Sequence, residues 1–260
     1  MISVRGYAPP PWLAAPAKRG ITRAFELPVR ALDAAVPVRT FSPEGIPDAE
    51  PLPLLLVHDG PEYDARAGLT QYLSAGIGGG WLPPLRAALL GPGPRDRWYS
   101  ANARYARALA LGVIPELSRR LRASRRIGMG ASLGALAMLH AHGRHPGALD
   151  ALFLQSGSFF TPDTDRQERR FAYYQRVTRF VAQVHEGEVP AGGLHAAAIP
   201  VALTCGSAEE NLANNRLMAA TLGDRGYPAA LHEVPGGHNF TAWRDALDPH
   251  LTALLRRRPV

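Results

Sequence analysis

Residues 127–134 read IGMGASLG, and this order predicts a short strand that turns sharply into a helix with Ser132 at the apex. Glycines two positions before and two positions after the serine let the strand and helix backbones approach closely. One residue of such a turn is forced into an unfavourable φ/ψ region. The chain holds 26 glycines, so the pattern alone has little weight. The residues on either side strengthen the prediction of a strand-turn-helix, because residues 126–129 are typical of a strand and residues 133–140 of a buried apolar helix. Ser132 is therefore a candidate nucleophile.

The length and composition indicate an ordinary globular protein. A chain of 260 residues with 46% hydrophobic and 20% charged residues is large enough for one α/β domain, so we expect a single domain over 1–260. No run of 18 apolar residues occurs and prolines interrupt the first 20 residues, so we expect neither a signal peptide nor a membrane span. The single cysteine, Cys205, excludes an intrachain disulfide and favours a cytoplasmic location.

The formal net charge of +7 does not by itself indicate a nucleic-acid partner. Lys18 is the only lysine, and the arginines are spread along a chain rich in alanine, glycine and proline. This composition is typical of a GC-rich genome rather than of a nucleic-acid-binding surface, so no nucleic-acid partner is expected. An anionic small-molecule substrate is compatible with the charge.

Apolar runs alternate with helical patterns along the chain. Antiparallel edge strands are expected within 20–40, further strands at 54–57, 85–90, 126–129, 152–154, 201–204 and 231–234, and helices at 69–77, 103–122, 133–140, 210–226 and 241–255. This alternation predicts a mostly parallel central sheet with helices on both faces. The arginine-rich segment 161–193 lies between strands, and we interpret it either as a lid-like insertion over the carboxyl ends of the sheet or as a surface excursion.

A serine nucleophile needs a base and an acid. In α/β-hydrolases these follow in the chain order serine, acid, histidine, each after a strand. His238 follows the last predicted strand in a glycine-rich turn and can take a proton near neutral pH. Glu209 and Glu210 follow the strand at 201–204. We prefer Glu209 as the acid because it precedes the predicted helix. Glu210 would lie in the first turn of that helix, where the macrodipole favours a carboxylate without any catalytic role. Glu210 stays the alternative.

The developing oxyanion requires two hydrogen-bond donors. One is the backbone N–H of Leu133, and the other is expected from the loop HDGPEY at 58–63. Because Pro61 has no N–H, the second donor must come from Gly60, Glu62 or a side chain such as that of Tyr63.

Six blocks of this sequence resemble the esterase D-type family, which includes enterochelin and bacillibactin esterases. They are HDGPEY (58–63), RDRWYSAN (95–102), GASLGA (130–135), QSGSFF (155–160), CGSAEENLANNR (205–216) and PGGHNFTAWRDAL (235–247). The resemblance implies an α/β-hydrolase fold and hydrolysis of carboxylic esters, with siderophore trilactones among the family's substrates. It implies Ser132 as nucleophile and His238 as base, and it places Arg97 near the cleft. The family's second oxyanion donor usually follows the Asp-Gly pair, where this chain has Pro61.

Further residues are expected to contact the substrate, and no metal or cofactor is implied. The expected substrate-binding residues are Asp59, Tyr63, Arg97, Ser156 and Trp243, although Ser156 could equally cap the turn after its strand. The histidines at 140, 142 and 145 are spaced like metal ligands, but their place at a helix end before a proline favours helix capping.

The sequence therefore predicts a serine carboxylic-ester hydrolase that acts through an acyl-enzyme on a small ester, siderophore-type esters included. Two alternatives stay open. An acyltransferase would share every motif but exclude water, and a non-catalytic binding protein would keep the hydrolase fold without turnover.

Overall fold

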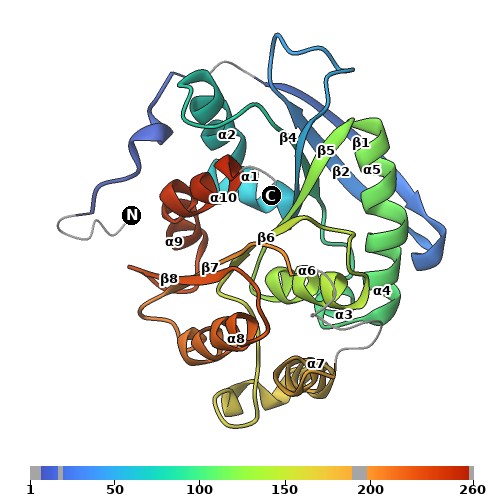
Figure 1. Ribbon diagram of the computed structural model, residues 1–260, viewed down its shortest axis with the longest axis vertical. Helices are drawn as coiled ribbons and strands as arrows, with labels where there is room; N and C mark the ends of the chain where they lie inside the picture. The colour runs from blue at the N-terminus through green and yellow to red at the C-terminus, as the bar shows by residue number, and fades with distance from the viewer. Residues whose placement is uncertain (1–6, 17–19, 189–197, 258–260) are drawn as a thin grey trace.

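A computed structural model describes residues 7–16, 20–188 and 198–257 of the protein (Figure 1). Its sheet is built from β1 (Ile21–Val29), β2 (Ala34–Ser42), β3 (Leu52–His58), β4 (Arg86–Leu90), β5 (Ala123–Ala131), β6 (Ala151–Gln155), β7 (Val201–Gly206) and β8 (Ala229–Val234). The strands lie in the order β1-β2-β4-β3-β5-β6-β7-β8. The pairs β1/β2 and β2/β4 are antiparallel, and the other neighbours are parallel. The predicted mostly parallel sheet with antiparallel strands at one edge is confirmed.

The helices cover both faces of this sheet. They are α1 (Gly60–Ala67), α2 (Leu69–Gly78), α3 (Arg95–Tyr99), α4 (Ala103–Ala108), α5 (Ile114–Arg120), α6 (Leu133–Arg144), α7 (Tyr174–Glu186), α8 (Leu212–Asp224), α9 (Phe240–Asp245) and α10 (Thr252–Arg256), with 3-10 turns η1 (Pro11–Leu13), η2 (Arg30–Leu32) and η4 (Arg166–Arg170) and π-helical turns η3 (Leu109–Val113) and η6 (Leu247–Leu251). Leu54 and Leu56 of β3 face a core formed with α3 to α8, whereas Leu55 and Val57 face a core formed with α1, α2, α9 and α10. A central strand buried on both faces reads as a continuous apolar run, which is why β3 is recognisable in the sequence.

Two predicted elements differ from the structure. Part of the expected loop 58–63 is helical, because α1 begins at Gly60. Pro61 lies in its first turn, where a missing N–H costs no intrahelical bond. The single helix expected over 241–255 is broken at Asp248, which has non-helical φ −110° and ψ 126°. Asp248 precedes Pro249, and the proline ring disfavours the α conformation at the residue before it.

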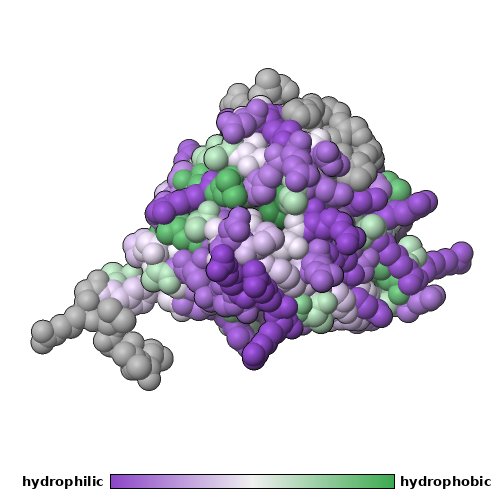
Figure 2. Space-filling model, turned by 90° about the horizontal axis from the view of Figure 1, so that it is seen from below, coloured by the Kyte–Doolittle hydropathy of each residue, from purple (hydrophilic) through white to green (hydrophobic). Residues whose placement is uncertain are grey.

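The segment 161–188 forms a layer outside the sheet that contains η4 and α7. One side of α7 is apolar and packs inward through Val177, Phe180, Val181 and Val184. The surface at this end of the molecule is dominated by hydrophilic residues, as Figure 2 shows. The remainder of the expected insertion, 189–193, lies outside the described residues. The single-domain organisation and the action of 161–193 as a lid stay predictions.

Of the three histidines near the end of α6, His145 is the C-cap residue, whereas His140 and His142 point into the protein. His142 Nε2 lies 2.8 Å from the Tyr227 hydroxyl, and the His140 ring packs edge-on against Phe180 with 4.7 Å between centroids. Burial lowers the pKa of His140 to about 3 and that of His142 to about 4, so both rings are neutral. Helix capping is therefore the wrong interpretation for these two residues. The described part of the chain contains no group of three or more His, Cys, Asp or Glu side chains that could hold a metal ion.

Within the described ranges, every helix is too short or too polar to cross a bilayer.

The close approach of β5 and α6 predicts a large penalty for a side chain at Gly130. A Cβ there would lie 2.5 Å from the carbonyl carbon of Gly134. Since backbone atoms cannot yield, we expect Gly130→Ala to lower the free energy of unfolding by about 3 kcal/mol, measured by urea denaturation. Gly112→Ala is the control, because nothing lies within 4 Å of a Cβ at that helical position. It should leave the stability unchanged or raise it by up to about 1 kcal/mol. Equal stabilities for the two variants would contradict the packing argument.

Candidate active site

Ser132 occupies a strained turn between β5 and α6. Its backbone has φ 56° and ψ −125°, a conformation that non-glycine residues rarely adopt. The turn is held from one side by the segment after β6. The Ser132 N–H donates to the Gln155 carbonyl at 2.9 Å, and the Ser158 N–H donates to the Ser132 carbonyl at 3.2 Å. The sharp strand-to-helix turn expected from the sequence is present, with the serine at its apex.

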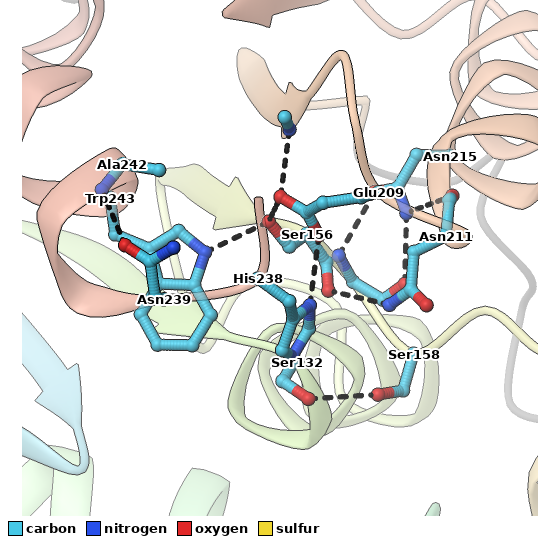
Figure 3. Close-up of polar contacts among 12 residues, drawn as sticks. Ser132, Ser156, Ser158, Glu209, Asn211, Asn215, His238, Asn239, Ala242 and Trp243 are labelled. Carbon is cyan, nitrogen blue, oxygen red and sulfur yellow. Dashed lines mark hydrogen bonds and ion pairs between the residues drawn. The ribbon is translucent and has the colours of Figure 1, made fainter. Parts of the chain in front are cut away.

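His238 and Glu209 form a hydrogen-bonded pair beside this turn (Figure 3). His238 Nδ1 donates to Glu209 Oε2 at 2.8 Å, and only 1% of the Glu209 side chain is exposed. Glu209 Oε1 accepts from the Ser156 hydroxyl at 2.7 Å and from the Gly206 N–H at 2.8 Å. Burial alone would raise the pKa of the Glu209 carboxyl, but the hydrogen bonds from His238, Ser156 and Gly206 hold that pKa below its ordinary value of 4.5. An ionised carboxylate is therefore held against the imidazole. Glu210 is exposed, and the hydrogen bonds and ion pairs of the described residues include none between it and His238.

Ser156 and Trp243 support this pair from behind. Ser156 is fully buried, and its hydroxyl accepts from Trp243 Nε1 at 2.9 Å while donating to Glu209. The indole also packs edge-on against the His238 ring, with 5.1 Å between centroids and 82° between planes. Both residues were expected to contact the substrate; the structure places them around the acid and the base instead.

A cavity of about 230 Å³ joins the nucleophile to the pair. It is lined by Ser132, Leu133, Ser158, Phe160, Glu168, Phe171, Glu209, Glu210, Asn211 and His238. In the structure the Ser132 hydroxyl lies 3.2 Å from the Ser158 hydroxyl (Figure 3). The hydrogen bonds found for the described residues do not include one between Ser132 and His238. Ser132, Glu209, His238 and Leu133, which the sequence singled out separately, thus share one cavity.

The other predicted site residues lie outside this lining. Asp59 is buried and forms an ion pair with Arg95, at 2.9 Å. The Tyr63 hydroxyl donates to Gln155 Oε1 at 2.9 Å. Arg97 is exposed, and its carbonyl oxygen accepts hydrogen bonds from neighbouring side chains. Arg95 rather than Arg97 therefore points toward the carboxyl end of β3, where it pairs with Asp59.

Gly60 and Glu62, the expected second oxyanion donors, lie in the first turn of α1 and are also absent from the cavity lining.

The lining includes Ser158, which from the sequence could either line the cleft or cap the turn after its strand, and it includes Phe160 and Glu168, which sequence reasoning did not assign. Asn215 fixes the segment that carries Ser158, because its side chain accepts from the Gly157 N–H at 3.0 Å and donates to the Gly157 carbonyl at 2.9 Å. The block QSGSFF after β6 was a usable signal for Ser158 and Phe160, since loops at the carboxyl ends of parallel strands build such sites. No comparable signal marks Glu168.

Solved structures of several esterases share this arrangement of the chain. The enterobactin esterase FES from Shigella flexneri, in the presence of enterobactin, superposes with a TM-score of 0.78 at 22% identity. That comparison covers 95% of this chain and 62% of the other, so this chain spans less than two thirds of the Shigella protein. A ferulic acid esterase gives a TM-score of 0.74 at 17% identity over 92% of this chain and 98% of the other. The siderophore hydrolase EstA from Aspergillus nidulans gives 0.65 at 15% identity over 97% of each chain.

No curated protein sequence matches the chain significantly. The family model described as "putative esterase" matches residues 30–254, which is most of the chain. With the sheet order, the turn at Ser132 and these structural matches, the fold is an α/β-hydrolase fold. The chain belongs to the putative esterase family.

Proposed function

We propose that the protein is a serine carboxylic-ester hydrolase that works through an acyl-enzyme. The observation that carries this proposal is the hydrogen-bonded His238–Glu209 pair facing the same cavity as the strained Ser132. A base oriented by a buried carboxylate, beside a serine on a sharp turn, is the arrangement that activates a hydroxyl as a nucleophile.

The proposed reaction begins with a rotation of the Ser132 side chain. Its hydroxyl leaves Ser158 and turns toward His238 Nε2 by a change of side-chain rotamer. The imidazole takes the serine proton as Oγ attacks the ester carbonyl, and Glu209 stabilises the imidazolium that forms. The imidazolium then gives the proton to the departing alcohol. A water molecule, deprotonated by the same imidazole, releases the acid from the acyl-enzyme.

The oxyanion is assigned to backbone donors at two helix starts. The Leu133 N–H lies in the first turn of α6, where intrahelical acceptors are lacking. In the first turn of α1, Gly60 or Glu62 supplies the second N–H, and Pro61 between them supplies none. Tyr63 is the weakest candidate, because its N–H donates to the Asp59 carbonyl at 3.0 Å and its hydroxyl is bound to Gln155.

The proposed substrate is a small ester, with siderophore-type and feruloyl esters as the classes that the structural matches suggest. An anionic substrate is compatible with the net charge of the chain, but no arginine of the described residues lines the cavity to bind one. A cytoplasmic location stays part of the proposal.

Removal of the nucleophile or the base tests the proposal directly. We expect Ser132→Ala and His238→Ala each to lower kcat for p-nitrophenyl butyrate by roughly 10⁴ to 10⁶-fold, because each removes a group that acts as a unit with the other. A fluorophosphonate probe should label the native protein covalently and leave Ser132→Ala unlabelled. If the native protein neither hydrolyses the ester nor takes the label, it is a binding protein. If the acyl group passes only to an added alcohol, it is an acyltransferase.

The choice of acid is tested by two neighbouring substitutions. Glu209→Gln should lower kcat for p-nitrophenyl butyrate by roughly 10³ to 10⁴-fold, because a neutral amide cannot stabilise the imidazolium. Glu210→Gln should cause a far smaller loss, since no hydrogen bond or ion pair of the described residues joins Glu210 to His238. Steady-state rates of both variants, with circular dichroism to verify folding, give the comparison. A larger loss for Glu210→Gln would move the acid to that position.

The lowered pKa of Glu209 predicts a pH-dependent contribution to stability. Between the folded-state pKa and the ordinary value of 4.5, the unfolded chain binds more protons at this group than the folded chain. The contribution is therefore complete above the ordinary pKa and is lost as the pH falls through the folded-state pKa. We expect the difference in unfolding free energy between the native protein and Glu209→Gln to shrink from about pH 6 to about pH 3, measured with urea. Ser132→Ala keeps the carboxylate and should follow the native pH dependence. A constant difference would show that the carboxylate has no shifted pKa.

A further inference from the structure

We propose that the catalytic cavity recognises esters that carry an organic cation, an ammonium or guanidinium group, in their acyl or alcohol part. This inference rests on the proposed esterase function and specifies the substrate class of that site.

The charged residues that line the cavity besides His238 are three glutamates. Glu209 is hydrogen-bonded to His238, whereas the carboxylates of Glu168 and Glu210 form no hydrogen bond or ion pair with any described residue. No arginine of the described chain lines the cavity, although the formal net charge of the protein is +7. Two carboxylates without partners repel each other across the space where a substrate must lie. A cation placed between them would relieve this repulsion.

The electrostatic environment of Glu168 agrees with this arrangement. Burial raises the pKa of its carboxyl, the charges of Glu210 and Asp165 raise it further, and His238 lowers it. Glu168 is thus close enough to Glu210 and to His238 for their charges to act on it.

Two aromatic rings complete the lining. Phe160 and Phe171 face the same cavity and meet edge to face, with 6.5 Å between centroids. A cation at the face of an aromatic ring is attracted by the ring quadrupole, and aromatic rings beside carboxylates bind quaternary ammonium groups. An anion would be repelled by the carboxylates. The aromatic residues are therefore a second feature, independent of the acidic ones, that favours a cation.

The segment that carries Glu168 is anchored. Asp165, fully buried, accepts from Asn214 Nδ2 at 2.7 Å and from the Thr161 N–H at 2.8 Å, so the start of η4 is bound to α8. The arginines of η4 are exposed to solvent and do not line the cavity; they are Arg166, Arg169 and Arg170. Glu168 is thus the member of this turn whose charge faces the cavity.

Two pairs of esters with matched shapes test the inference. In the acyl pair, the p-nitrophenyl ester of 4-(trimethylammonio)butanoate is compared with that of 5,5-dimethylhexanoate, where carbon replaces the charged nitrogen. In the alcohol pair, butyrylcholine is compared with 3,3-dimethylbutyl butyrate. For at least one pair we expect kcat/KM of the cationic ester to exceed that of the neutral ester about tenfold. In Glu168→Gln/Glu210→Gln this ratio should fall toward one.

The control is Glu186→Gln, which removes an exposed carboxylate of α7 outside the cavity and should keep the native ratio. Ratios at or below one for both pairs in the native protein would overturn the inference, and so would a preference that survives in the double variant or disappears in the control. Hydrolysis of the neutral esters tests the proposed esterase function separately from the preference for a cation. If neutral and cationic esters are both left intact, and p-nitrophenyl butyrate with them, the proposed esterase function fails rather than its specificity.

Discussion

The backbone turn at Ser132 is the constraint on which the rest of the site depends. A non-glycine residue at φ 56° and ψ −125° costs about 1–3 kcal/mol and persists only where its surroundings enforce it. Two features enforce it here. Gly130 lets β5 approach α6 more closely than any side chain would allow, and Gln155 and Ser158 bind the Ser132 peptide groups on both sides. The strain directs the hydroxyl into the cavity while the strand and helix keep regular geometry.

The residues 155–158 at the end of β6 connect this turn to Glu209 and, through Trp243, to His238. Their backbone at 155 and 158 binds Ser132, and the Ser156 hydroxyl bridges Glu209 and the Trp243 indole. Asn215 of α8 fixes the peptide between these contacts. Ser132, Glu209 and His238 follow three different strands, and this short segment contacts Ser132 and Glu209 directly and His238 only through the Trp243 indole. A change in this segment would therefore alter how Ser132 and the His238–Glu209 pair lie relative to each other.

The sequence predicted those features that depend on residues close together in the chain, namely the buried strands and the turn at Ser132. Strands buried on both faces are apolar runs, and the turn at Ser132 needs small neighbours, so the sheet and the candidate nucleophile were visible in the sequence. Chain order led to His238 and Glu209, which the structure brings together. The start of α1 was missed because an Asp-Gly-Pro sequence is typical of a loop. The lining residues Glu168 and Phe171 could not be found, since their position depends on how the segment 161–188 folds back over the sheet. No periodicity encodes that contact.

The charge of the chain and the charge of its cavity are separate physical quantities. Arginines on the exposed surface are surrounded by water and salt, which screen them over about 10 Å. Carboxylates that are partly withdrawn from water, such as Glu168, are screened less and dominate the field that a bound molecule meets. A net charge of +7 therefore describes how the whole protein behaves in solution, whereas the side chains that line the cavity set the charge that a molecule bound there would meet. Since three glutamates and no arginine of the described chain line the cavity at Ser132, its local charge is opposite in sign to the net charge of the chain.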